Sequence, residues 1–79
     1  MQLFIKTLTS TIPSFYIDIE SEDTILKLKE KINKEKKIEI KDQVLLYAGY
    51  RLEDHKTFKE YNITKNEPLI IMRIVKKIQ

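Results

Sequence analysis

The chain contains no cysteine and only one glycine among its 79 residues. The lack of cysteine excludes a disulfide framework and a thiolate metal site, and nothing points to an oxidising compartment, so we expect a location in the cytoplasm, the nucleus or both. No apolar run approaches the roughly 18 residues that cross a membrane. The N-terminal MQLFIKTL also lacks the layout of a signal peptide. We therefore expect no membrane partner.

The sequence also lacks the groupings of residues that carry catalysis. It holds no glycine-rich phosphate loop, no serine or cysteine nucleophile paired with a base, and no carboxylate pair with an obvious cleft. His55 is the single histidine, and its segment EDHK reads as a surface turn rather than a metal site. The sequence thus predicts a protein that is not an enzyme and that uses no small-molecule substrate, cofactor or metal.

Hydrophobic periodicity predicts a small α+β domain, and the length predicts a single one over residues 1–79. Alternating apolar residues predict two hairpins and a last strand, and apolar residues at helical spacing predict one amphipathic helix and a single helical turn. The expected segments, in order, are residues 1–7, 15–20, a helix within 21–37, then 44–47, 50–52, the turn 57–62 and the strand 68–78. This order, ββαββ, a short helical turn and β, is plausible as a β-grasp sheet that wraps its helix, with the last strand beside the first.

The predicted helix is rich in lysine. Asp23 or Thr24 is expected to cap its first turn, and lysines crowd its last turns, where the helix dipole favours cations. The whole chain carries 15 Lys and Arg against 12 Asp and Glu, a net charge of +3, which fits a mixed solvated surface. A scaffold for nucleic acid or ribonucleoprotein that uses this basic helix is an open alternative. It would lose affinity steeply with salt, and no aromatic platform in the sequence supports it.

The single glycine, Gly49, lies in the segment LLYAGYRLED between two apolar runs. A tight reversal between two strands requires positive φ at a central position, and glycine adopts positive φ without the cost that a β-carbon brings. The sequence therefore predicts a hairpin turn at Ala48 and Gly49.

Several short motifs, in order and with their mutual spacing kept, resemble ubiquitin: MQLFIKTLT, DTI, YAG, LED and YNI. The resemblance covers nearly the whole chain, with two extra residues in the first hairpin loop and no other gap expected before the last strand. It implies the β-grasp fold, no enzymatic activity, and recognition of partners through an exposed apolar patch on the sheet.

The same resemblance identifies the residues of that patch. The patch positions of ubiquitin match Leu8, Leu46, Ile70 and Met72, and Gly49 matches the glycine beside the patch. All four patch residues are apolar, and a bare backbone at Gly49 would let a partner helix approach closely. The alternative is an exposed apolar surface without a cellular role, and self-association as a weak dimer is a further risk of so apolar a patch.

A second candidate surface comes from the first hairpin. Phe4 and Tyr16 are expected to lie opposite each other on its solvent side as an aromatic cross-strand pair. Such a pair either binds a partner or only stabilises the hairpin, and the sequence leaves both possibilities open.

Besides the longer first loop, the chain departs from ubiquitin at its C-terminal end and after the helix, among other positions. RIVKKIQ stands where the C-terminal diglycine of ubiquitin would fall, and Lys37 stands where a glycine follows the helix, so its end lacks a glycine cap. Without the diglycine, we expect a non-conjugating interaction domain, the N-terminal part of a longer protein such as a proteasome shuttle factor. Its expected partners are proteasome receptors or other ubiquitin-binding helices. The rival hypothesis is a covalent modifier whose diglycine lies beyond residue 79.

Overall fold

The computed structural model describes residues 1–8, 11–63 and 66–75. In chain order it contains β1 (Gln2–Thr7), β2 (Phe15–Asp18), α1 (Ile25–Lys36), the short 3₁₀ turn η1 (Ile40–Asp42), β3 (Gln43–Tyr47), β4 (Tyr50–Arg51) and β5 (Leu69–Ile74). The predicted order of strands and helix is confirmed, and their ends move by a few residues. The turn η1 was not predicted.

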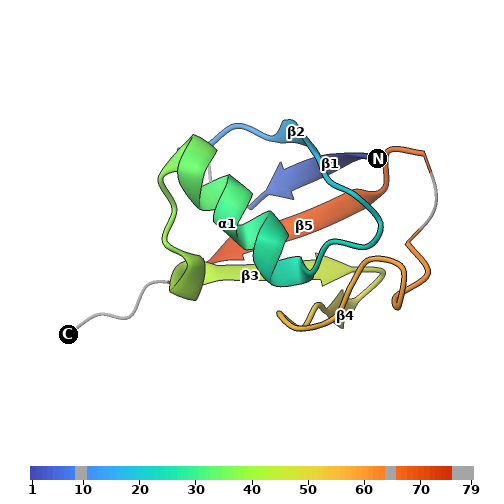
Figure 1. The fold of residues 1–79 in the computed structure, drawn as a ribbon. Coiled ribbons are helices and arrows are strands. Elements are labelled where there is room, and N and C mark those ends of the chain that lie inside the picture. The colour runs from blue at the N-terminus through green and yellow to red at the C-terminus, as the bar shows by residue number, and fades with distance from the viewer. Residues whose placement is uncertain (9–10, 64–65, 76–79) are drawn as a thin grey trace.

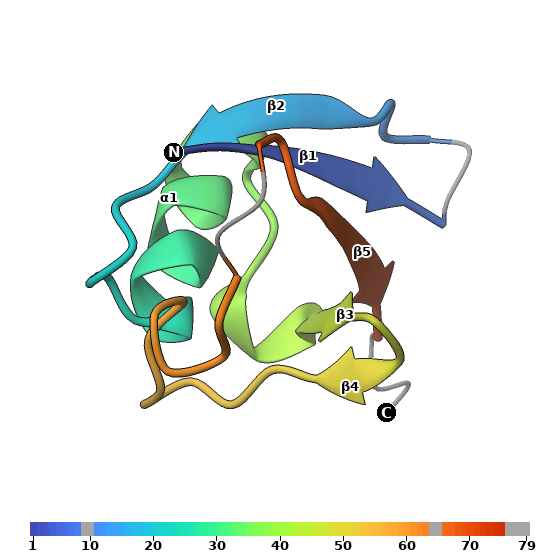
Figure 2. The same ribbon diagram turned by 90° about the vertical axis from the view of Figure 1, so that its right-hand side faces the viewer.

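The five strands form one mixed sheet in the order β2-β1-β5-β3-β4. β1 and β5 run parallel at its centre, and the other neighbours are antiparallel. The helix α1 crosses one side of this sheet (Figure 1), and the sheet curves around it (Figure 2). The expected β-grasp α+β roll is thus confirmed, including the central position of the last strand.

The core lies between α1 and the side of the sheet that faces it, which we call the inner face. Helical spacing brings Ile25, Leu28 and Ile32 to the buried side of α1, and all three are fully buried. The other core residues with no exposed surface are Leu3, Ile5, Leu45, Phe58, Ile63, Ile70 and Met72. This packing fixes which side of every strand points away from the helix.

Both ends of α1 follow the sequence expectation. Thr24 is the N-cap, and its side-chain oxygen accepts a hydrogen bond from the Lys27 N–H at 3.2 Å. Lys37 ends the helix in the left-handed region, with φ of 61°, and its N–H donates to the Asn33 carbonyl at 2.9 Å. A lysine therefore occupies a conformation that glycine adopts at lower cost.

The segment 57–62 forms a hydrogen-bonded turn that is closed by a capping box. Thr57 Oγ1 accepts from the Glu60 N–H at 3.0 Å, and the Glu60 carboxylate accepts from the Thr57 N–H at 2.9 Å. These hydrogen bonds, first the one from the Thr57 backbone and then the one from its side chain, lower the pKa of Glu60 below its usual value. The turn is packed onto the core through the fully buried Phe58.

The hairpin between β3 and β4 confirms the prediction at Gly49. Its two central residues, Ala48 and Gly49, have φ of 50° and 84°, as a two-residue turn with the twist of the strands requires. A β-carbon at Gly49 would meet no atom within 4 Å. Backbone conformation, not lack of space, therefore favours glycine here.

The expected exposure of Ile70 and Met72 is wrong. Both side chains are fully buried on the inner face of β5, where Ile70 pairs with Ile5 and Met72 with Leu45. The ungapped match to ubiquitin places the last strand one residue out of register. Because side chains alternate along a strand, a slip of one residue exchanges its two faces.

Candidate protein-interaction face

The side of the sheet that points away from α1, the outer face, carries a run of apolar side chains. No described helix covers this face (Figure 2). Five of its residues, from β2 to β3, form what we call the apolar stripe: Tyr16, Phe4, Leu69, Ile71 and Leu46. Tyr16 is 52% exposed and Leu69 is 46% exposed, and the other three are half-buried. The stripe thus crosses four of the five strands.

Strand register places the residues of the stripe beside one another in two rows. In the first row Tyr16 pairs with Phe4, and Phe4 pairs with Leu69. In the second row Ile71 pairs with Leu46. Leu69 and Ile71 lie two positions apart on β5, so they share a face and connect the two rows.

Cations surround the second row of the stripe. Lys6 pairs with Ile71 on one side, and Arg51 pairs with Leu46 on the other. Arg73 follows Ile71 on the same face of β5. All three cations are exposed, and none forms an ion pair within residues 1–8, 11–63 and 66–75. The apolar pair Ile71 and Leu46 therefore has a positively charged surround.

Leu8 and Gly49 lie at the margins of this face. Leu8, one residue past β1, is 59% exposed, and its N–H donates to the Met72 carbonyl. Gly49 is exposed in the turn that follows β3, three residues after Leu46. The structure thus keeps three of the five expected patch residues at the surface and buries Ile70 and Met72.

The aromatic pair expected on the first hairpin is present. The ring centroids of Phe4 and Tyr16 lie 4.9 Å apart with an interplanar angle of 49°, a tilted arrangement typical of favourable aromatic contacts. Leu69 lies between this pair and the second row, because it pairs with Phe4 and lies two positions before Ile71 on β5.

Sequence reasoning missed Leu69, Ile71 and Arg73 as residues of the outer face. The run LIIM is apolar at every position, so hydrophobic periodicity alone cannot distinguish its two faces. Arg73 carries the missing signal, because an unpaired guanidinium is almost never fully buried. Residues two and four positions before it, Ile71 and Leu69, must therefore share its outward direction.

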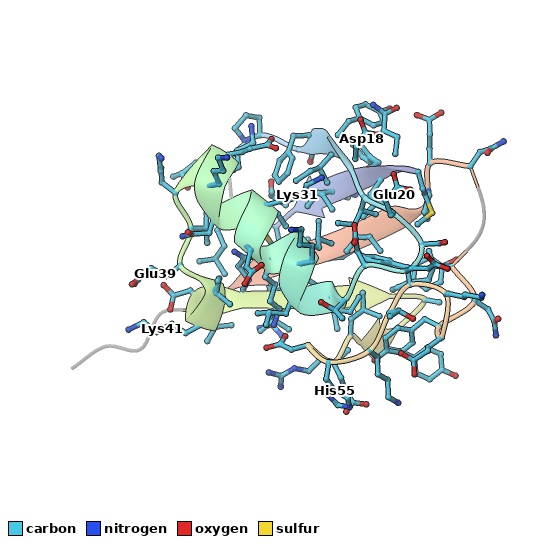
Figure 3. All side chains as sticks on the ribbon, in the orientation of Figure 1. Asp18, Glu20, Lys31, Glu39, Lys41 and His55 are labelled. Carbon is cyan, nitrogen blue, oxygen red and sulfur yellow. The ribbon has the colours of Figure 1, made fainter. Side chains whose placement is uncertain are left out.

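The helix offers fewer free cations than its sequence suggests. Lys29 is only 7% exposed, and its Nζ lies 2.6 Å from Asp54 Oδ1. Lys31 reaches the end of β2, where its Nζ donates to the Asp18 carbonyl at 2.7 Å (Figure 3). The exposed Lys27 and Lys34 share their side of α1 with two glutamates, Glu30 and Glu35. The mixed surface weakens the case for a nucleic-acid scaffold on this helix.

The described ranges contain neither a metal-binding cluster nor a membrane-spanning helix. In residues 1–8, 11–63 and 66–75, no three His, Cys, Asp or Glu residues come together in a way that could hold a metal ion. In the same ranges, no helix is long and apolar enough to cross a membrane. The outer face of the sheet is therefore the candidate site that the geometry favours.

Comparisons with known proteins agree with the β-grasp fold. A family model described as the ubiquitin family matches residues 3–76. The chain is 40% identical over 75 residues to human UV excision repair protein RAD23 homolog B, and the alignment covers 91% of this chain and 18% of that protein. It is 38% identical over 55 residues to UV excision repair protein rhp23 of Schizosaccharomyces pombe, covering 70% of this chain and 15% of that protein. It is also 36% identical over 69 residues to NEDD8-like protein RUB3 of Arabidopsis thaliana, covering 87% of this chain and 86% of that protein.

Proposed function

Because this chain belongs to the ubiquitin family, we propose that residues 1–79 form one non-conjugating ubiquitin-like domain that binds helical segments of proteasome receptors or other ubiquitin-binding modules. The partner docks on the outer face around Leu46 and Ile71, and Leu8 and Gly49 lie at the edge of the contact. The domain acts by binding, without an enzymatic activity of its own, in the cytoplasm, the nucleus or both.

The observation that carries this proposal is an uncovered apolar pair on the outer face of the sheet. Leu46 and Ile71 lie side by side on neighbouring central strands, half-buried and without an element of the described chain above them. Burying such side chains against an amphipathic helix gains roughly 25 cal/mol per Å² of apolar surface. The surrounding cations Lys6, Arg51 and Arg73 would orient a partner that carries acidic residues.

The relatives support a role within a larger protein. This chain spans under a fifth of the length of the UV excision repair proteins that it matches. We infer that the domain delivers its host protein to a receptor, as a shuttle factor does, and the activity of that host belongs to other segments of the longer chain.

The first test is an NMR titration of the isotopically labelled domain with a ubiquitin-interacting helix peptide from a proteasome receptor. We expect localised shifts at the amides of Leu46, Gly49 and Ile71. Amides on the exposed side of α1 should stay unchanged. An absence of shifts at millimolar peptide would refute this function for the outer face.

A charge substitution makes the test specific. Leu46→Asp places a carboxylate in the middle of the apolar pair, and we expect it to abolish peptide binding because the carboxylate would have to be buried without a partner. The matched control is Leu26→Asp, at a partly exposed leucine on α1, which should leave the affinity unchanged. Equal affinity for both variants would contradict the assignment.

One comparison favours a second candidate, a covalent modifier. NEDD8-like protein RUB3 is matched over 86% of its own length. Against this function, residues 73–79 read RIVKKIQ and contain no diglycine. The test is a charging assay with a ubiquitin-type activating enzyme, ATP and the longest natural form of the protein. A thioester adduct would establish the modifier, and its absence would favour the binding domain.

A further inference from the structure

Leu69 has no role in the contact described so far, although it is the most exposed apolar residue of β5. It is 46% exposed and pairs with Phe4 across the parallel strands. Its neighbour two positions along the strand, Ile71, belongs to the central apolar pair. A polar side chain at this position would separate the aromatic pair from Leu46 and Ile71, and leucine connects them instead.

We propose that the aromatic pair and the central apolar pair form a single binding surface, with Leu69 as the specificity-determining residue between them. The occupant is one amphipathic helix with acidic residues along the edges of its apolar side, lying obliquely across β2, β1, β5 and β3. This inference rests on the proposed function and extends its contact from Ile71 and Leu46 to Tyr16 and Phe4.

The dimensions of the apolar stripe set the length of that helix. Neighbouring strands lie about 4.8 Å apart, so the three steps from β2 to β3 span about 14 Å. A helix rises 1.5 Å per residue, so about eleven residues, or three turns, cover that distance. Apolar side chains at i, i+3 or i+4, i+7 and i+10 or i+11 would face the stripe along its whole length. A helix that contacts only Leu46 and Ile71 needs one of these turns.

The charges around the stripe favour an acidic helix over a second copy of this chain. Lys6, Arg51 and Arg73 are exposed on the outer face. Against these three cations, the described strands present one acidic residue on that face, Asp18 at the far end of β2. Two copies stacked face to face would bring six cations together while burying the apolar stripe, and like charges opposed at an interface repel each other and weaken the association. Carboxylates on a partner helix would be attracted by the same cations.

The experiment is the titration with the receptor helix peptide, with every amide of the sheet followed, in the natural sequence and in Leu69→Thr. Threonine keeps a good strand former at position 69 and removes most of the apolar contact. We expect shifts at Tyr16, Phe4 and Leu69 as well as at Leu46 and Ile71. We also expect Leu69→Thr to weaken binding by about fivefold, as the loss of a partly buried leucine predicts.

The control variant is Leu26→Gln, at a leucine that is 37% exposed on α1, on the other side of the sheet. It should bind the peptide as tightly as the natural sequence. The amide resonances of the residues that neighbour position 69 are compared between the free Leu69→Thr domain and the natural sequence. If these resonances keep their positions, the fold is intact.

The possible outcomes separate this inference from the function on which it rests. Shifts confined to Leu46, Gly49 and Ile71, with unchanged affinity for Leu69→Thr, would overturn the extended surface and leave the proposed function in place. No shifts at all would overturn both. Shifts along the stripe on dilution of the domain without peptide would identify a second copy as the occupant and overturn the acidic helix.

Discussion

The two faces of β5 have nearly the same chemistry and opposite roles. Ile70 and Met72 on the inner face are fully buried beneath α1, whereas Leu69 and Ile71 on the outer face have no described element above them. Apolar character alone therefore does not make a side chain part of the core. Nearby unpaired cations distinguish the outer face, namely Arg73 on the same strand and Lys6 on the next.

The largest expected effect comes from comparing two adjacent isoleucines. Ile70→Ala should lower the free energy of unfolding by about 3 kcal/mol, because it removes fully buried methyl groups and leaves a cavity in the core. Ile71→Ala should cost only about 1 kcal/mol, because its half-buried side chain leaves no closed cavity. Urea denaturation of the two variants measures the difference.

Peptide affinity should show the reverse order. Ile71→Ala is expected to weaken binding of the receptor helix. Ile70→Ala should bind as the natural sequence does, when binding is measured under conditions in which this variant stays folded. Equal unfolding costs for the two alanine variants would mean that the register of β5 is not the one described.

The fold could be predicted from the sequence because the hydrophobic periodicity of most strands and of the helix is strong. The site could be predicted only in part, because this periodicity is lost in β5. Ile17 and Ile19 alternate with the polar residues Asp18 and Glu20, but four consecutive apolar residues in β5 give no alternation to read. Gln43 was missed entirely. Its side chain is 2% exposed, and its Nε2 donates to the Lys29 and Ile38 carbonyls, a role that a polar residue shows only once the helix end lies beside it.

The surroundings of the cations also differ between the two sides of the sheet. This difference offers a second prediction, with an effect of intermediate size. Lys29, on the helix side, is buried against Asp54, whereas the outer cations are solvated. Asp54→Ala should cost about 2 kcal/mol, because it leaves the Lys29 ammonium mostly buried without its partner. Lys29→Met should cost less, about 1 kcal/mol, because it removes the charge and keeps the volume.

Chemical denaturation of both variants tests this order, with Lys27→Met as the control at an exposed position of the same helix. The control should change stability by less than about 0.5 kcal/mol. A larger cost for Lys29→Met than for Asp54→Ala would show that the ion pair contributes net stability beyond compensating for burial.

The smallest expected effect is a gain, at the end of the helix that covers the inner face. Lys37 has φ of 61° and ψ of 33°, a conformation in which a β-carbon contacts the following carbonyl and which costs about 1 kcal/mol relative to glycine. Lys37→Gly should therefore raise the free energy of unfolding by up to that amount, reduced by the greater entropy of glycine in the unfolded chain. Lys34→Gly, three residues earlier and inside the same helix, should instead lower it by about 1 kcal/mol. Thermal or urea unfolding of the pair decides the matter, since equal destabilisation by both glycines would mean that the helix continues through residue 37. Opposite signs would show that Lys37 makes the helix end less stable than the fold allows. Peptide binding to the outer face should stay unchanged in both variants.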